Sequence, residues 1–178
     1  NALSKWMKAE ICRDGIQYAQ EYARGKAETP VKKIGACEGS GTAMTFEPDP
    51  EIFKEINFDW DRILERLRQQ AYLTRAVTLM LRDERTPATA EDGSALTPSY
   101  TFSFDGGIVS YVRHLNAGEE VKHENVFSVG KEMTTNGNRA IMVEVAFQYT
   151  DDLQPKELSF ANHVHTPEGG MHLTGFRA

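Results

Sequence analysis

Cysteine and long apolar runs are both scarce in this sequence. Only two of the 178 residues are cysteines, Cys12 and Cys37, and they do not form a C-x-x-C pair. Two isolated cysteines predict reduced thiols rather than a disulfide framework or a zinc site. No apolar run approaches the roughly 18 residues of a membrane-spanning helix, and the first ten residues lack a basic-then-apolar signal pattern. We therefore expect a soluble, cytoplasmic chain with no membrane partner.

An excess of positive charge is also missing. The chain has 20 Lys and Arg against 26 Asp and Glu, for a net charge of −6. Domains that grip a phosphate backbone usually gather basic residues on one face. The composition therefore argues against this chain binding nucleic acid by itself, and its length allows one moderate domain or two small ones.

The first 50 residues show the alternation of a β-sheet. Apolar residues recur at every second position between Met7 and Ile11, and Asp14-Gly15 follows as a hairpin signal. Three further strand-like runs come after the hairpin turn: "IQYAQEYARG", "VKKIGA" and "GTAMTFEP". The pattern predicts a four-stranded, mostly antiparallel meander.

The rest of the chain mixes helices with strands. Residues 58–75 carry one apolar stripe at helical spacing, with Asp59 as the expected N-cap. Strands are predicted around residues 76–84 and 101–104, and the stretch "RTPATAEDGSALTPS" between them is either a long hairpin loop or a linker. A short helix over 105–118 and a last helix from Gly169 frame three more strand candidates: "ENVFSV", "RAIMVEVAFQYT" and "ELSFANHV", with "TNGN" and "DDLQPK" as turns. This order predicts an α+β fold.

Five segments resemble the ATPase region of DNA gyrase B subunits, which are type IIA topoisomerases. In chain order they read "GSGTAMTFEPD", "LRDE", "DGGIVSYVRHLN", "VEVAFQYTDD" and "SFANHVHTPEGGMHLTGFRA". The resemblance implies the C-terminal part of a GHKL-type ATPase sandwich over residues 1–104. The N-terminal part of a ribosomal S5 domain 2-like transducer domain would follow over residues 105–178. We accordingly expect a fragment of a longer protein, cut at both ends.

The resemblance also assigns three nucleotide-binding residues. Thr42 matches the adenine-pocket threonine of the family, whose hydroxyl can donate to and accept from the base. Met44, two residues further on the same strand, is expected to form the apolar wall behind the adenine. Arg13 is expected at the rim of the ATP pocket, where gyrases contact coumarin-type inhibitors. The turn before Thr42 lacks the strand–loop–helix context of a phosphate cradle.

No catalytic residue is expected within this chain. In the family, the general-base glutamate, the magnesium-binding asparagine and the glycine-rich lid come before residue 1, and the transducer lysine comes after residue 178. The cofactors ATP and Mg²⁺ would therefore bind mostly through residues elsewhere, and the fragment alone is expected to be inactive. The parent enzyme would act on DNA with the gyrase A subunit, as an ATP-hydrolysing topoisomerase whose B subunits dimerise when they bind ATP.

Other interpretations stay open. A topoisomerase IV B subunit shares the same motifs, and a MutL-like, ATP-gated interaction module would use the same two folds. An RNA-binding S5-like domain is disfavoured by the negative charge. His163 and His165 have the spacing of two residues on one strand face. They lack the third ligand typical of zinc, so we expect no metal site.

Overall fold

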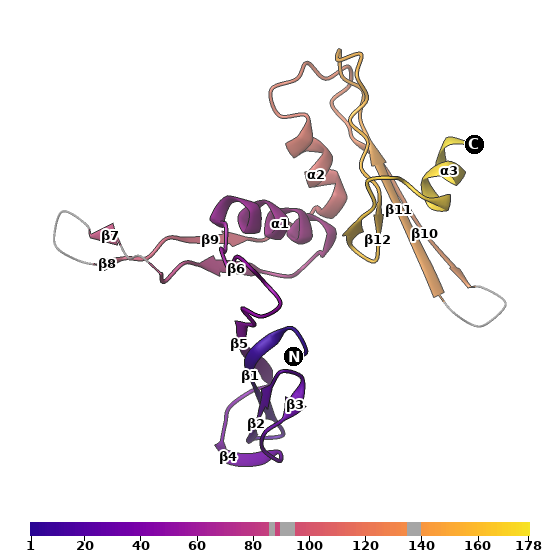
Figure 1. The fold of residues 1–178 in the computed structure, drawn as a ribbon. Helices are drawn as coiled ribbons and strands as arrows, with labels where there is room; N and C mark the ends of the chain where they lie inside the picture. Colours follow the sequence, from indigo (N-terminus) through magenta and orange to yellow (C-terminus); the bar gives the residue numbers. More distant parts are fainter. Residues whose placement is uncertain (86–87, 90–94, 135–139) are drawn as a thin grey trace. The chain divides into compact units, whose positions relative to one another are not determined.

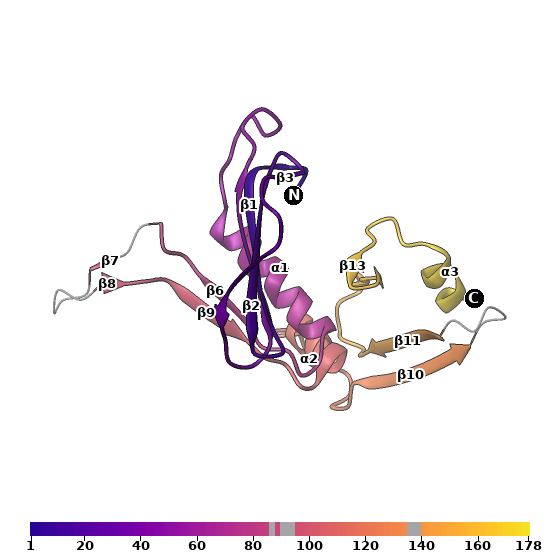
Figure 2. The same cartoon turned by 90° about the horizontal axis from the view of Figure 1, so that it is seen from below.

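Strands and helices are mixed along the chain, in agreement with the α+β class that the sequence predicts. The computed structural model describes residues 1–85, 88–89, 95–134 and 140–178. It divides into two compact units, residues 1–58 and residues 59–178 (Figures 1 and 2). None of the helices in these described ranges is long and apolar enough to cross a membrane.

The first unit is an antiparallel sheet built on one hairpin. Strands β1 (Ser4–Arg13) and β2 (Ile16–Ala23) meet at Asp14 and Gly15, whose φ angles of 54° and 75° are both positive. Positive φ at both central residues is what a type I′ turn requires, and Asp-Gly tolerates it. The predicted hairpin is therefore confirmed.

The predicted meander order is wrong. Both β3 (Lys26–Ala27) and β4 (Lys32–Ala36) pair with β2, along its edge away from β1. Strand β5 (Gly41–Pro48) pairs with β1 and not with β4. This register sets Met44 opposite Ala9 and Phe46 opposite Met7. The apolar side chains of β5 thereby join the apolar face of β1, which a strand added beyond β4 would not achieve.

The expectation of reduced thiols is also wrong, because Cys12 and Cys37 form a disulfide with their Cα atoms 6.0 Å apart. Cys12 lies in β1 opposite Gln17 of β2, and Gly35 of β4 pairs with the same glutamine. After β4 the chain passes next to the Asp14-Gly15 turn, where the Cys37 N–H donates a hydrogen bond to the Gly15 carbonyl at 3.1 Å. Strand pairing thus brings together two residues whose 25-residue separation shows no disulfide signal.

The second unit begins with the predicted helix. Helix α1 (Trp60–Leu73) is capped by Asp59, whose carboxylate accepts from the Arg62 N–H at 2.7 Å. Helix α2 (Gly107–Leu115) follows as expected. Ala71 and Tyr72 of α1 are buried together with Phe102, and these three residues form the core of the unit.

A β-hairpin connects the two helices. Strands β6 (Leu79–Arg82) and β9 (Ser99–Phe102) pair antiparallel, and the short strands β7 (Ala88–Thr89) and β8 (Ala95–Leu96) pair beyond them. The sequence left residues 85–99 as either a hairpin loop or a linker. The hairpin is confirmed, and the linker is wrong. Residues 86–87 and 90–94 of this stretch lie outside the described residues.

The C-terminal part contains two more hairpins and a short helix. Two of the strand candidates correspond to β10 (Phe127–Thr134), which begins and ends later than expected, and to β11 (Ala140–Phe147). The two strands pair antiparallel, and the expected turn between them lies outside the described residues. The single strand predicted over "ELSFANHV" is wrong. Asn162 and His163 have φ angles of 47° and 65°, so the chain turns there. This turn separates β12 (Phe160–Ala161) from β13 (Val164–His165), and α3 (Met171–Arg177) closes the chain.

Candidate functional site

The sheet register of the first unit determines which side chains share a face. Side chains alternate along a strand, and directly paired residues point to the same side of the sheet. Ile11 pairs with Thr42 of β5 and Ala9 pairs with Met44. Arg13, two residues beyond Ile11, points to the same side. The three residues expected to contact nucleotide therefore lie on one face, with Arg13 at the hairpin end.

This face is open over the stretch that carries these residues. Ile11 is 42% exposed and Met44 is 55% exposed, and Thr42 is exposed as well. Apolar side chains gathered on one strand face form a surface that a ligand or another part of the protein can cover. A flat aromatic ring would cover Met44 and Ile11 while the Thr42 hydroxyl remains free to hydrogen-bond at its edge.

The charged end of the face is only weakly paired. The Nε of Arg13 lies 3.7 Å from Oδ2 of Asp14, and both side chains are more than three-quarters exposed. Exposed ion pairs of this kind contribute little, because water and salt screen them. The Arg13 guanidinium therefore stays available to an anionic group.

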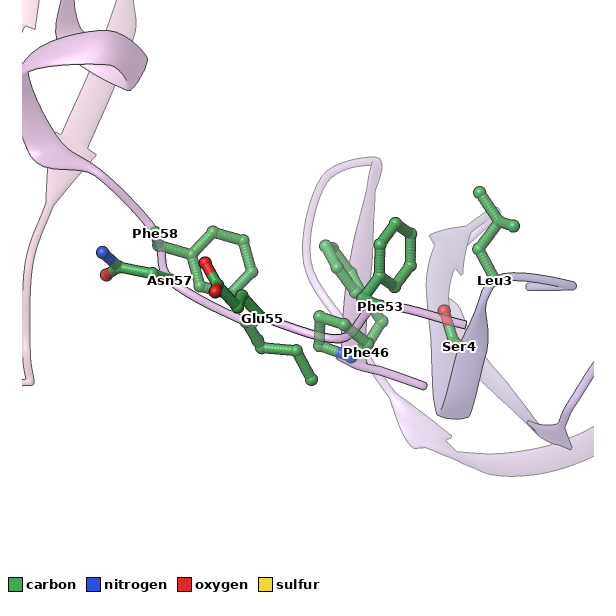
Figure 3. Close-up of a pocket in the computed structure, with 9 residues that line it drawn as sticks. Leu3, Ser4, Phe46, Phe53, Glu55, Asn57 and Phe58 are labelled. Carbon is green, nitrogen blue, oxygen red and sulfur yellow. The ribbon is translucent and has the colours of Figure 1, made fainter. Parts of the chain in front are cut away.

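An apolar pocket of about 320 Å³ lies at the far end of β5 from Thr42; Figure 3 shows the residues that line it. Phe46, two residues beyond Met44, lines it together with Phe53 and Phe58, which belong to the segment after β5. Leu3, Ser4, Pro48, Glu55, Ile56 and Asn57 complete the lining. None of the three predicted contact residues lines this pocket, so the candidate site is the open face and not this hollow.

Two residues in the same row as Thr42 were not predicted as site residues from the sequence. Ile11 lies directly opposite Thr42, and Tyr18 of β2 lies directly opposite Ile11, so the three form one row across the sheet. The turn at Asp14-Gly15 fixes the pairing of Ile11 with Tyr18, and counting outward from it would have identified that pair. The pairing of β5 with β1 left no comparable signal.

The histidine pair of the second unit does not share a strand face. His163 lies in the turn with φ of 65°, whereas His165 belongs to β13. His165 lines a hollow of about 970 Å³ together with residues of α1 and α2 such as Arg62 and His114. Within the described parts of the chain, no group of three or more His, Cys, Asp or Glu residues could hold a metal ion.

Comparison with known proteins points to one family. The sequence model of the DNA gyrase B family matches residues 107–178. The B subunit of DNA gyrase from Thermotoga maritima is 41% identical over 180 residues, which cover all of this chain and 27% of that protein. The B subunit of DNA topoisomerase 4 from Streptococcus pneumoniae is 39% identical and is covered to 26%. The chain thus spans about a quarter of the length of these relatives.

A solved structure agrees with the sequence matches. The 43K ATPase domain of Thermus thermophilus gyrase B, in complex with an aminocoumarin, superposes with a TM-score of 0.80 at 32% identity. The alignment covers 98% of this chain and 44% of that structure. The fold inferred from the motifs is thereby confirmed, and so is the resemblance to DNA gyrase B subunits, which extends over the whole length of this chain.

Proposed function

We propose that this chain is part of the ATP-binding and transducer region of a type II DNA topoisomerase, within a gyrase B subunit. In this proposal ATP binding favours a closed dimer of B subunits, because nucleotide binds that state better than the open one. The transducer passes the closed state to the DNA-cleaving part of the enzyme, where one duplex passes through another. The proposed partners are DNA and the gyrase A subunit, and the proposed location is the cytoplasm.

The observation that carries this proposal is the open face shared by Arg13, Thr42 and Met44. It combines an apolar platform, one hydroxyl and one weakly paired guanidinium. These groups match the aromatic base, the polar edge of the base and the anionic or polar rim of a bound nucleotide. The likeness to a gyrase B ATPase domain that holds an aminocoumarin supports the same assignment.

The proposed division of labour places residues 1–104 in the ATPase domain and residues 105–178 in the transducer. This boundary falls inside the second compact unit, where α1 and β9 precede it and α2 follows. Contacts between α1 and α2 would then link the two functions. Tyr111 of α2, for example, stacks on Tyr72 of α1.

The described residues contribute binding rather than phosphoryl transfer. We assign no step of the reaction to a metal held by this chain. Thr42 would orient the base, Met44 and Ile11 would exclude water from one side of it, and Arg13 would hold the rim. The groups that activate water and stabilise the transferring phosphoryl are proposed to lie in other parts of the enzyme.

The test is a DNA topology assay on the complete gene product that carries this sequence. We expect the protein, mixed with the A subunit of the same organism, to introduce negative supercoils into relaxed plasmid when ATP is present. Thr42→Ala should raise the ATP concentration that is needed for half-maximal supercoiling. Thr45→Ala is the matched control, because Thr45 lies on the same strand but points to the opposite face.

Two other outcomes would point to the rival functions. The similarity to a topoisomerase 4 B subunit, at 39% identity, makes ATP-dependent decatenation without supercoiling the second candidate. A protein that binds and hydrolyses ATP but changes no DNA topology would contradict both assignments. That result would favour a MutL-like interaction module.

A further inference from the structure

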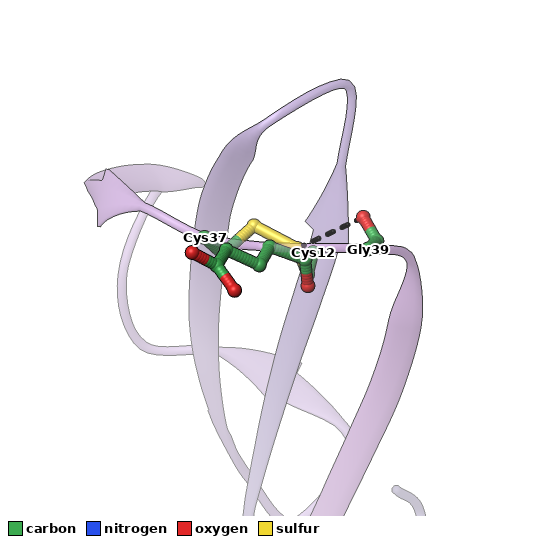
Figure 4. The surroundings of a disulfide bond; sticks show 4 residues. Cys12, Cys37 and Gly39 are labelled. Atoms are coloured by element: carbon green, nitrogen blue, oxygen red, sulfur yellow. Dashed lines mark hydrogen bonds between the residues drawn. A yellow bond between two sulfur atoms is a disulfide. The ribbon is translucent and has the colours of Figure 1, made fainter.

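The disulfide between Cys12 and Cys37 joins parts of the sheet that do not pair directly (Figure 4). Cys12 lies one residue before the end of β1, and Cys37 follows the last residue of β4. Strand β4 pairs with β2 and not with β1. The bond therefore ties β1 to the segment that leads from β4 into β5.

This segment leads straight to the candidate nucleotide face. Gly41, the first residue of β5, lies opposite Cys12, and Thr42 follows it opposite Ile11. Glu38, Gly39 and Ser40 connect Cys37 to Gly41 in an exposed, irregular stretch. The other end of the bond adjoins Arg13. One covalent link thus sits next to two of the three residues that form the proposed site.

The disulfide acts on this site through the backbone. Cys12 is adjacent to Ile11 in β1, so its side chain points to the sheet face opposite Thr42. The link therefore leaves the nucleotide face uncovered while it restrains the path of the chain into β5. Breaking it would remove the covalent restraint at Cys37, from which residues 38–40 start. A loop with more freedom must lose that freedom when a ligand orders it.

The surroundings of the two sulfurs suit a reversible bond. Both cysteines are half-buried and not sealed in a core, which leaves the sulfurs within reach of a second thiol. The Cys12 Sγ lies 3.4 Å from the Gly39 carbonyl. A disulfide sulfur has no proton to donate, whereas a Cys12 thiol would donate a weak hydrogen bond to that carbonyl. In the reduced form, the Gly39 carbonyl can therefore accept a hydrogen bond from the Cys12 thiol.

From these observations we infer that Cys12 and Cys37 form a redox pair that regulates the nucleotide face, an inference that rests on the proposed function. A dithiol reductant breaks the S–S bond by exchange: it gives up two electrons and two protons and becomes a disulfide, and two cysteine thiols form. The oxidised form holds Gly41 and Arg13 in place for nucleotide. The reduced form populates this arrangement less often and binds nucleotide more weakly, by roughly threefold to tenfold.

The experiment compares the two redox states of the complete gene product. A non-hydrolysable ATP analogue is titrated by calorimetry into protein oxidised with diamide and into protein reduced with dithiothreitol. Alkylation and mass spectrometry count the free thiols in each sample. The Cys12→Ser/Cys37→Ser variant, checked for folding by circular dichroism, removes the bond permanently. The wild-type comparison needs no substitution, so the test survives if that variant does not fold.

Three results are expected together. Affinity falls on reduction, it is restored by re-oxidation, and the double variant binds like the reduced protein whether or not reductant is present. Equal affinity in the two states would overturn the regulation while leaving the proposed function intact. The regulation is equally overturned if the thiols never oxidise, or if the double variant still responds to reductant. Failure of both states to bind the analogue would contradict the proposed nucleotide function itself, and the regulation with it.

Discussion

Tyr72 of α1 stacks face to face on Phe104, with ring centroids 3.8 Å apart and ring planes 13° from parallel. On α2, the Tyr111 ring stacks with Tyr72 at 4.9 Å and the His114 ring at 5.5 Å. Tyr72 and Phe104 lie before the proposed boundary between residues 104 and 105, and Tyr111 and His114 lie after it. The stack therefore connects the proposed ATPase domain to the proposed transducer.

Truncating the centre of this stack should destabilise the second unit strongly. Tyr72 is only 5% exposed, and replacing a buried aromatic residue by alanine typically costs about 3–5 kcal/mol. We expect Tyr72→Ala to lower the Tm by several degrees. Tyr72→Phe, which keeps the stacked ring, should leave the Tm close to that of the wild type. Similar Tm values for Tyr72→Ala and the wild type would mean that the stack does not hold α1 to α2.

Gly107, at the start of α2, should not tolerate a side chain. Its φ is +56°, and an added Cβ would lie 2.9 Å from Cγ of Arg75. Arg75 is ion-paired with Glu144 of β11 at 3.0 Å, so moving it away would disturb a second contact. We expect Gly107→Ala to lower the stability by more than about 1 kcal/mol, because both backbone strain and a clash result.

Chemical denaturation can measure this loss against a matched substitution. Gly130 of β10 has no positive φ, and its nearest contact for an added Cβ is an ordinary 3.7 Å. Gly130→Ala should therefore change the denaturation midpoint far less than Gly107→Ala. The reverse order would refute the steric argument.

The carboxyl group of Asp83 should titrate well below its usual range. Hydrogen bonds from the Arg85 side chain and from the Arg85 backbone N–H lower the pKa of Asp83 from 3.8 to about 2. Because the folded-state pKa is depressed, the stabilising contribution is complete above pH 3.8. It is lost as the pH falls through about 2.

Carbon-detected NMR of the Asp83 carboxyl can follow this titration. Arg85→Ala should raise the midpoint toward 3.8. Arg82→Ala is the control, since Arg82 pairs with Glu84 at 3.6 Å and not with Asp83. A midpoint near 3.8 in the unmodified protein would show that the Arg85 contacts do not form in solution.

Local patterns in the sequence predicted most individual elements. Asp59 marked the start of α1 because a cap and an apolar stripe depend only on neighbouring residues, and Asp14-Gly15 marked the first hairpin for the same reason. The long-range pairings were harder to predict. The return of β5 to β1 and the meeting of Cys12 with Cys37 depend on which sheet edge is free. No local pattern records that choice.

The candidate site divides in the same way. Family motifs identified Thr42, Met44 and Arg13, and whether these residues bind nucleotide remains a prediction. Their common face follows from the β1–β5 register, which the wrong meander order would not have given. Counting outward from the predicted turn pairs Ile11 with Tyr18, but only the pairing of β5 with β1 places these two residues in one row with Thr42.

At Asn162 and His163, by contrast, a local pattern predicted an element that the structure does not contain. An apparently continuous strand pattern over "ELSFANHV" concealed two residues with positive φ. Alternation of side chains says nothing about the sign of φ, so a strand and a tight two-residue hairpin can share one pattern.

The central claim is that the Thr42 face of the sheet binds nucleotide. The most direct measurement is the affinity of the complete gene product for a non-hydrolysable ATP analogue, compared between Thr42→Ala and Thr45→Ala. Both residues are exposed threonines of β5, and they point to opposite faces. Losing a hydrogen bond to the base should weaken binding in Thr42→Ala by roughly tenfold, or about 1.4 kcal/mol, while Thr45→Ala binds like the wild type. Equal affinities in the two variants would contradict the claim.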